Sequence, residues 1–179
     1  MDSSAVELTG ELIRARQRTD RVFARVPDAL LFERPVAERH RIAFYLGHLE
    51  AFDSNLLLPQ RNNGTNATRR LDRLFAFGID PVGTGLPADT PQDWPAIDEI
   101  RDYVYQSRSQ LDRWMTQRPH RSPDGVPFAT LLNAAIEHRL MHAETLAYIL
   151  NRLPIDKPLR AVSAVTCQFG DDDMVAVVH

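Results

Sequence analysis

Histidines are the residues of this chain whose types and spacing indicate chemistry. His138 and His142 stand four residues apart in a segment that reads His-Arg-Leu-Met-His. On an α-helix, residues with this spacing lie on the same side, one turn apart. Two imidazoles so placed can bind one metal ion through their ring nitrogens.

His48 is a third candidate ligand, in an apolar segment that runs from Ile42 to Phe52. An imidazole among apolar side chains carries a desolvation cost unless it has a polar partner. A metal ion, Glu50, Asp53 or a backbone carbonyl could each be that partner. Because a metal would satisfy three histidines at once, we expect one divalent ion to bind His48 together with the pair.

The donor set restricts the kind of metal but does not select one. Three neutral imidazoles suit Fe(II), Zn(II) or Ni(II). We expect a facial arrangement, open toward the connection formed by residues 60–92. Since imidazoles must be neutral to bind a metal, binding should weaken below about pH 6, near the pKa of free histidine.

Other side chains near these histidines in the sequence have weaker assignments. Glu144 lies about 160° around a helix from His142, so it is either an outer residue that orients a ligand or a carboxylate paired with an arginine. No general base stands out, and the catalytic residues are therefore left open. Four residues are candidates for shaping a pocket beside the metal: Tyr45, Phe52, Arg139 and Tyr148.

Helices must position these residues. Apolar residues recur every three or four positions in four long segments, and prolines separate the segments. The pattern predicts an all-α protein, an up-down four-helix bundle with a long connection between its second and third helices. Asp93, shortly before Pro95, is expected to cap the third helix. The segments are about 4–26, 38–58, 93–119 and 127–151, with a possible short helix at 71–77 in the connection.

The end of the chain differs from the bundle. Two β-prone segments, 161–165 and 174–178, flank an acidic turn. We therefore divide the chain into a metal-binding bundle at residues 1–155 and an extended tail at 156–179, which could form a hairpin.

Composition is that of one soluble globular domain. The chain has 179 residues, 44% hydrophobic and 25% charged, with a net charge of −3. Mixed charges argue against a nucleic-acid surface, and no apolar stretch is long enough to span a membrane. Cys167 is the single cysteine, which excludes an intrachain disulfide. With no signal peptide at the N-terminus, these features favour the cytoplasm.

The order and separation of His48, His138 and His142 resemble those of the DinB-like four-helix metalloproteins. Residues 5–155 are most similar to the amino-terminal domain of the sulfoxide synthases of ergothioneine biosynthesis, the EgtB type. The resemblance implies that these histidines bind a metal. In those synthases a second domain supplies much of the substrate pocket, and residues 155–179 are too short to contain it.

Two functions remain open at this stage. The first is a metal-dependent enzyme acting on a small cytosolic substrate such as a thiol, either a transferase or isomerase or an oxygenase of the non-heme iron type. The second is a non-enzymatic bundle that binds metal for stability and acts as a dimer or interaction module. Members of the resembled family that stand alone are often dimeric, so we also expect a homodimer.

Overall fold

The fold is described by a computed structural model, which places residues 3–59, 66–79, 86–117, 121–122 and 125–153. These residues form five α-helices and two short 3-10 turns, with no β-strand among them. The all-α prediction is thus confirmed for the described part of the chain. The predicted tail at 156–179, and the boundary before it, lie outside the described residues.

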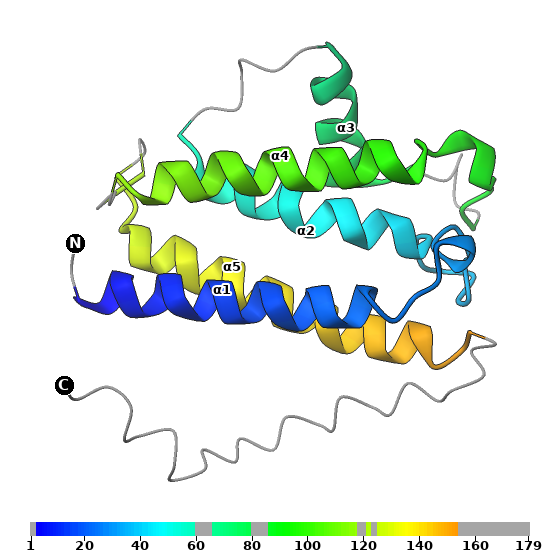
Figure 1. The fold of residues 1–179 in the computed structure, drawn as a ribbon, viewed down its shortest axis with the longest axis horizontal. Helices are drawn as coiled ribbons and strands as arrows, with labels where there is room; N and C mark the ends of the chain where they lie inside the picture. The colour runs from blue at the N-terminus through cyan, green and yellow to red at the C-terminus, as the bar shows by residue number, and fades with distance from the viewer. Residues whose placement is uncertain (1–2, 60–65, 80–85, 118–120, 123–124, 154–179) are drawn as a thin grey trace, which may run out of the picture.

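Four long helices lie side by side (Figure 1). α2 packs against α3, α4 and α5, and α1 packs against α5. The helix between α2 and α4 is longer than the predicted short helix, because it begins five residues earlier. The bounds are α1 Ser3–Phe23, α2 Ile42–Leu57, α3 Asn66–Phe77, α4 Ile97–Met115 and α5 Phe128–Leu150.

The directions of the helices correct the predicted up-down order. One apolar cluster joins the starts of α2 and α4 to the ends of α1 and α5. A second cluster joins the ends of α2 and α4 to the starts of α1 and α5. Hence α2 and α4 run parallel to each other and antiparallel to α1 and α5 (Figure 1). Parallel neighbours need a long connection, and the chain between α2 and α4, which contains α3, provides it.

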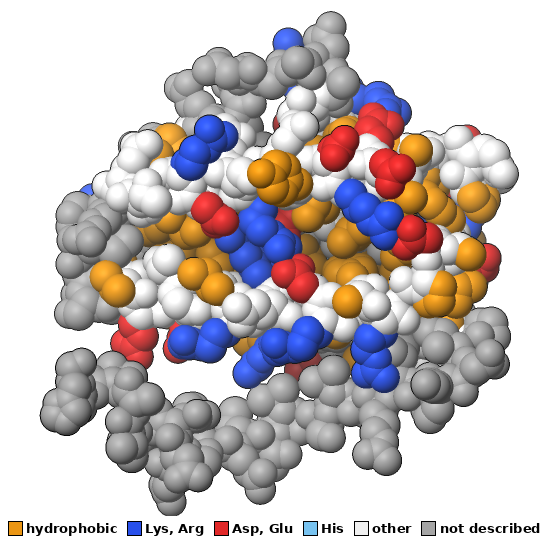
Figure 2. All heavy atoms as spheres, in the orientation of Figure 1, with side chains coloured by type: hydrophobic (Ala, Val, Ile, Leu, Met, Phe, Trp, Pro, Cys, Tyr) orange, Lys and Arg blue, Asp and Glu red, His pale blue; other side chains and the backbone are white. Residues whose placement is uncertain are grey.

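A layer of charged side chains separates the two apolar clusters. We call Arg16, Glu50, Asp53, Arg108 and Arg139 the ionic layer; all but Arg108 are buried. Figure 2 shows basic and acidic side chains gathered midway along the face formed by α4 and α1. Two ion pairs join these helices there, Arg108–Asp20 at 2.9 Å and Arg16–Asp112 at 2.5 Å.

The predicted cap of the third long helix is wrong in detail. The residue that precedes α4 is Ala96, which makes no side-chain cap. Asp93 instead belongs to a 3-10 turn over Pro91–Asp93, where its carboxylate accepts hydrogen bonds from the backbone N–H and hydroxyl of Thr90. The acid therefore closes a capping box one turn earlier than the sequence pattern suggested.

None of the helices in the described part of the chain is both long and apolar enough to cross a membrane.

Candidate metal centre

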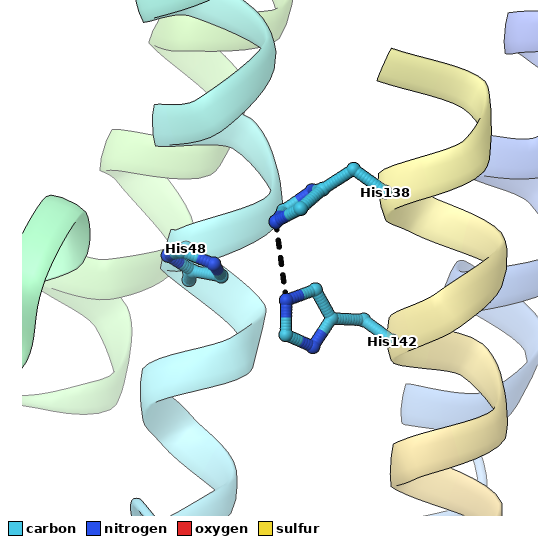
Figure 3. A group of neighbouring side chains, drawn as sticks. All are labelled: His48, His138 and His142. Carbon is cyan, nitrogen blue, oxygen red and sulfur yellow. Dashed lines mark hydrogen bonds between the residues drawn. The ribbon is translucent and has the colours of Figure 1, made fainter. Parts of the chain in front are cut away.

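The three histidines converge from two helices. His48 comes from α2, and His138 and His142 come from successive turns of α5. Their rings point into the same space between the helices (Figure 3). One ring nitrogen from each histidine lies within 4.8 Å of the others. Among the described residues this is the group of side chains that could hold a metal ion.

The ring of His48 has a defined orientation because its Nδ1 atom makes a hydrogen bond. Its Nδ1 lies 2.7 Å from the carbonyl oxygen of Phe75, on α3. A carbonyl only accepts, so Nδ1 carries the proton and donates, which leaves the lone pair of Nε2 free. A backbone carbonyl was one of the partners considered for His48 from the sequence. The same contact is the usual support of a metal-binding imidazole.

The pair on α5 also presents its Nε2 atoms. Nε2 of His138 and Nε2 of His142 lie 3.1 Å apart. Two nitrogens each about 2.1 Å from one ion lie roughly 3 to 3.5 Å apart in octahedral or tetrahedral geometry. The observed spacing falls in that range. The Nδ1 atoms of both rings are buried and have no hydrogen-bond partner among the described residues.

The electrostatic environment keeps these imidazoles neutral. Burial, and then the charge of the neighbouring histidines, lowers the pKa of His138 to about 3. Burial and the charge of His48 lower the pKa of His142 to about 4. Burial also lowers the pKa of His48. At neutral pH the three rings are therefore uncharged bases, which is the form that binds metals.

An aromatic ring of α2 lies against each ligand. Phe52 stacks on His138 with ring centroids 3.5 Å apart, and Phe44 stacks on His48 at 4.7 Å. The ring of Tyr45 lies 5.5 Å from that of His142. Tyr45 and Phe52, expected beside the site, therefore lie against it. Phe44 was not assigned to the site, although its position four residues before His48 places it one helical turn away.

Three other residues predicted near the metal do not join the histidines. Arg139 is fully buried and pairs with Glu50 and Asp53 in the ionic layer. Tyr148 is 48% exposed and accepts a hydrogen bond from Arg152. The side chain of Glu144 is exposed. The structure brings none of these three into the three-histidine group.

Sequence reasoning missed the support that α3 gives to the site. The contact to His48 is made by the backbone of Phe75, and a carbonyl carries no sequence signal. Gly47 is an indirect sequence signal of this contact, because a Cβ at that position would lie 2.4 Å from the ring of Phe75. A glycine inside an apolar helix often marks such a close approach.

The chain is similar to a known family over most of its helical bundle. Residues 11–146 match the family described as the DinB superfamily. The chain belongs to the DinB superfamily. The match covers α2, α4 and most of α1 and α5, and so includes all three histidines.

One relative of this DinB chain is named for a biosynthetic pathway. The chain is 30% identical over 139 residues to "Ergothioneine biosynthesis protein 1" of Neurospora crassa. The aligned part is 75% of this chain but only 15% of that fungal protein. The resemblance to ergothioneine-biosynthesis proteins is thus confirmed for a small part of the relative's length.

Proposed function

We propose that His48, His138 and His142 bind one divalent metal ion and that this ion serves catalysis on a small cytosolic substrate. The observation that supports the proposal is the convergence of three ring nitrogens within 4.8 Å, from rings that are neutral at physiological pH. Structural zinc sites in proteins are usually closed by four protein ligands, whereas catalytic sites use three and leave a position open. Three histidines match the second pattern.

A thiol is the first substrate class to test. The fungal relative is named for ergothioneine biosynthesis, and the synthases that the chain resembles form sulfoxides. A metal bound here would act as a Lewis acid or hold a substrate sulfur. The protein's own contribution would be to hold three neutral imidazoles beside Phe44, Tyr45 and Phe52. The Phe75 carbonyl would fix the tautomer of His48. Because the alignment covers 15% of the relative, we do not extend its whole activity to this chain.

The proposal can be tested by metal analysis. Protein purified anaerobically, then loaded with Fe(II), Zn(II) or Ni(II) and dialysed, should retain one equivalent of at least one metal. The variants His48→Ala, His138→Ala and His142→Ala should each retain much less. His40→Ala is a matched control, because the ring of His40 lies 4.0 Å from that of Phe44 but does not belong to the three-histidine group. A wild-type protein that retains no metal, or a His142→Ala variant that retains a full equivalent, would contradict the proposal.

A non-enzymatic role is the second candidate, and one observation favours it. In the described part of the chain the side chains in ring contact with the three histidines are aromatic, and no carboxylate joins their group. A general base is therefore not evident. In this alternative the metal stabilises a helical bundle that acts as a dimer or interaction module.

The two candidates differ in whether the metal has open positions. Azide or a small thiol added to the Co(II)-loaded protein should change its visible absorption spectrum if an open position exists. An unchanged spectrum, together with a dimer in sedimentation velocity, would favour the non-enzymatic module. A changed spectrum and turnover of a thiol would favour the enzyme.

A further inference from the structure

The ionic layer meets the two metal-bearing helices at the level of the histidines. Arg139 of α5 is 0% exposed and directly follows His138. Its Nε lies 2.7 Å from Oδ2 of Asp53, and its Nη2 lies 2.9 Å from Oε1 of Glu50. One guanidinium on α5 therefore contacts two carboxylates on α2.

A third contact joins Arg139 to the residue that follows His48. Nη2 of Arg139 donates to the backbone carbonyl oxygen of Leu49, at 3.3 Å. Leu49 directly follows His48 on α2. Arg139 thus links the residue after His138 on α5 to the residue after His48 on α2.

Glu50 and Asp53, which pair with Arg139, also contact two other arginines. Nη2 of Arg108 donates to Oε1 of Glu50 at 2.5 Å, and Nε of Arg16 lies 3.7 Å from Oδ2 of Asp53. Glu50 and Asp53 are 2% and 0% exposed. Buried charges in such a network cannot exchange their partners for water, so the geometry at this level is fixed.

We infer that Arg139 is a positioning residue for the metal centre: by joining α5 to α2 through Asp53, Glu50 and the Leu49 carbonyl, it sets the separation of His48 from His138 and His142. This inference rests on the proposed function. Metal sites tolerate little displacement, because ligands must be held to within about 0.5 Å of a productive geometry. A shift of α5 along α2 would move two ligands relative to the third.

The inference predicts that the charged contact controls metal affinity separately from stability. Asp53→Asn keeps the shape of the side chain but weakens its pairing with Arg139. Arg139→Lys keeps the charge but loses the two-pronged geometry, and Arg139→Met removes both. We expect Co(II) affinity to fall about 10- to 100-fold in Asp53→Asn and Arg139→Met, as for other residues that orient ligands, and less in Arg139→Lys. The Co(II) absorption bands should shift as the ligand geometry changes.

The control is a variant that loses stability without touching this contact. Leu132→Ala also removes a 0% exposed side chain from α5, in the apolar cluster away from the ionic layer. Thermal unfolding and Co(II) titration would be measured on all variants. The inference is supported if Asp53→Asn binds Co(II) at least tenfold more weakly than Leu132→Ala at similar stability. It is overturned if the two variants bind Co(II) equally well.

Failure of the proposed function would look different. If wild-type protein binds no Co(II), the metal centre itself is absent and the inference falls with it. If wild type binds one equivalent and Asp53→Asn binds with unchanged affinity and spectrum, only the positioning role of Arg139 is overturned. Should Arg139→Met fail to fold, the shape-conserving Asp53→Asn still decides the question.

Discussion

The imidazole of His138 lies flat on the ring of Phe52, with centroids 3.5 Å apart and planes inclined by 11°. Phe52 stands one helical turn after His48, so α2 supplies one ligand and also the surface against which a ligand of α5 rests. Stacking of this kind restricts rotation of the imidazole about its side-chain bonds. The imidazole is thereby held in one orientation, the one in which the proposed metal would bind it.

Replacing Phe52 should therefore weaken metal binding more than it weakens the fold. In Phe52→Leu an apolar side chain remains, but the flat contact is lost. Aromatic pairs contribute about 0.5–1.5 kcal/mol beyond their burial, which corresponds to roughly 2- to 12-fold in metal affinity. Co(II) or Zn(II) titration measures this change. Phe77→Leu is the control, since Phe77 is 69% exposed on α3, and it should bind metal like wild type.

Gly47→Ala should destabilise the protein and loosen His48. A Cβ at position 47 would lie 2.4 Å from Cδ1 of Phe75, a ring that is itself 0% exposed. Relief requires α3 to shift, which disturbs the Phe75 carbonyl that holds His48. We expect a loss of about 1–3 kcal/mol in the free energy of unfolding, typical of overpacking, measured by chemical denaturation.

Gly10→Ala should stabilise the protein, in contrast to Gly47→Ala. The new Cβ would meet only the end of the Arg14 side chain, at 3.6 Å. Because glycine inside a helix costs roughly 0.5–1 kcal/mol relative to alanine, this variant should be more stable than wild type. Equal effects of the two substitutions would show that the close approach of α3 to Gly47 is not as described.

The metal-free protein should lose stability as pH falls below about 6.5. The pKa values of His138 and His142 are lowered to about 3 and about 4 in the folded state, so in this window the unfolded chain binds more protons. Glu50, with a pKa of about 2, adds a loss in the same direction below its ordinary pKa of 4.5. Asp53 acts oppositely, because burial raises its pKa to about 6 and its contribution declines as pH rises from 3.8 to 6.

The histidine part of this pH dependence can be isolated. In the double variant His138→Gln/His142→Gln neither position titrates, so the free energy of unfolding should change less between pH 7 and pH 4. Urea denaturation at several pH values measures both proteins. The lowered pKa values also imply that metal should be retained somewhat below pH 6, the limit expected from free histidine. Parallel pH profiles for wild type and the double variant would contradict the assignment.

Asp89 should be important for stability although it lies far from the histidines in sequence. Its carboxylate is 1% exposed and accepts hydrogen bonds from Arg34, Arg41 and the indole N–H of Trp94. Asp89→Ala would leave two mostly buried guanidinium groups without this acid. We expect a loss of about 3–5 kcal/mol, as for other buried pairs broken on one side.

An exposed ion pair serves as the control for the buried contacts of Asp89. Asp28 pairs with Arg101 at 2.6 Å, but both side chains are at least half exposed. Asp28→Ala should destabilise the protein far less than Asp89→Ala, because solvent screens exposed pairs. A loss for Asp28→Ala as large as that for Asp89→Ala would mean that burial does not set the strength of these interactions.

Much of this architecture could be predicted because it rests on local patterns. The spacing of apolar residues indicates a helix wherever one face is buried, and the four long helices follow that rule. The pair His138 and His142 was equally readable, since four residues on a helix fix their relation. The direction of α4 was not readable. It depends on how the connection containing α3 crosses the bundle, and spacing within a helix says nothing about that crossing.

The contacts of Arg139 could not be predicted for a related reason. Arg139 adjoins His138 in sequence, but successive residues on a helix point about 100° apart. That rotation turns Arg139 toward the acids of α2 and away from the metal side. Predicting its place required knowing that Glu50 and Asp53 lie on the facing helix at the same level, which is a relation between two elements and not a property of either one.

The separation of the ligands along the chain has a consequence for folding. His48 and His138 are on the order of 90 residues apart, and α3 and α4 lie between them. A metal bound by both would close this whole segment into a loop, much as a reversible cross-link does. Such a link should slow unfolding, and adding a chelator should speed it. The rate at which the protein opens would then depend on how much free metal its surroundings contain.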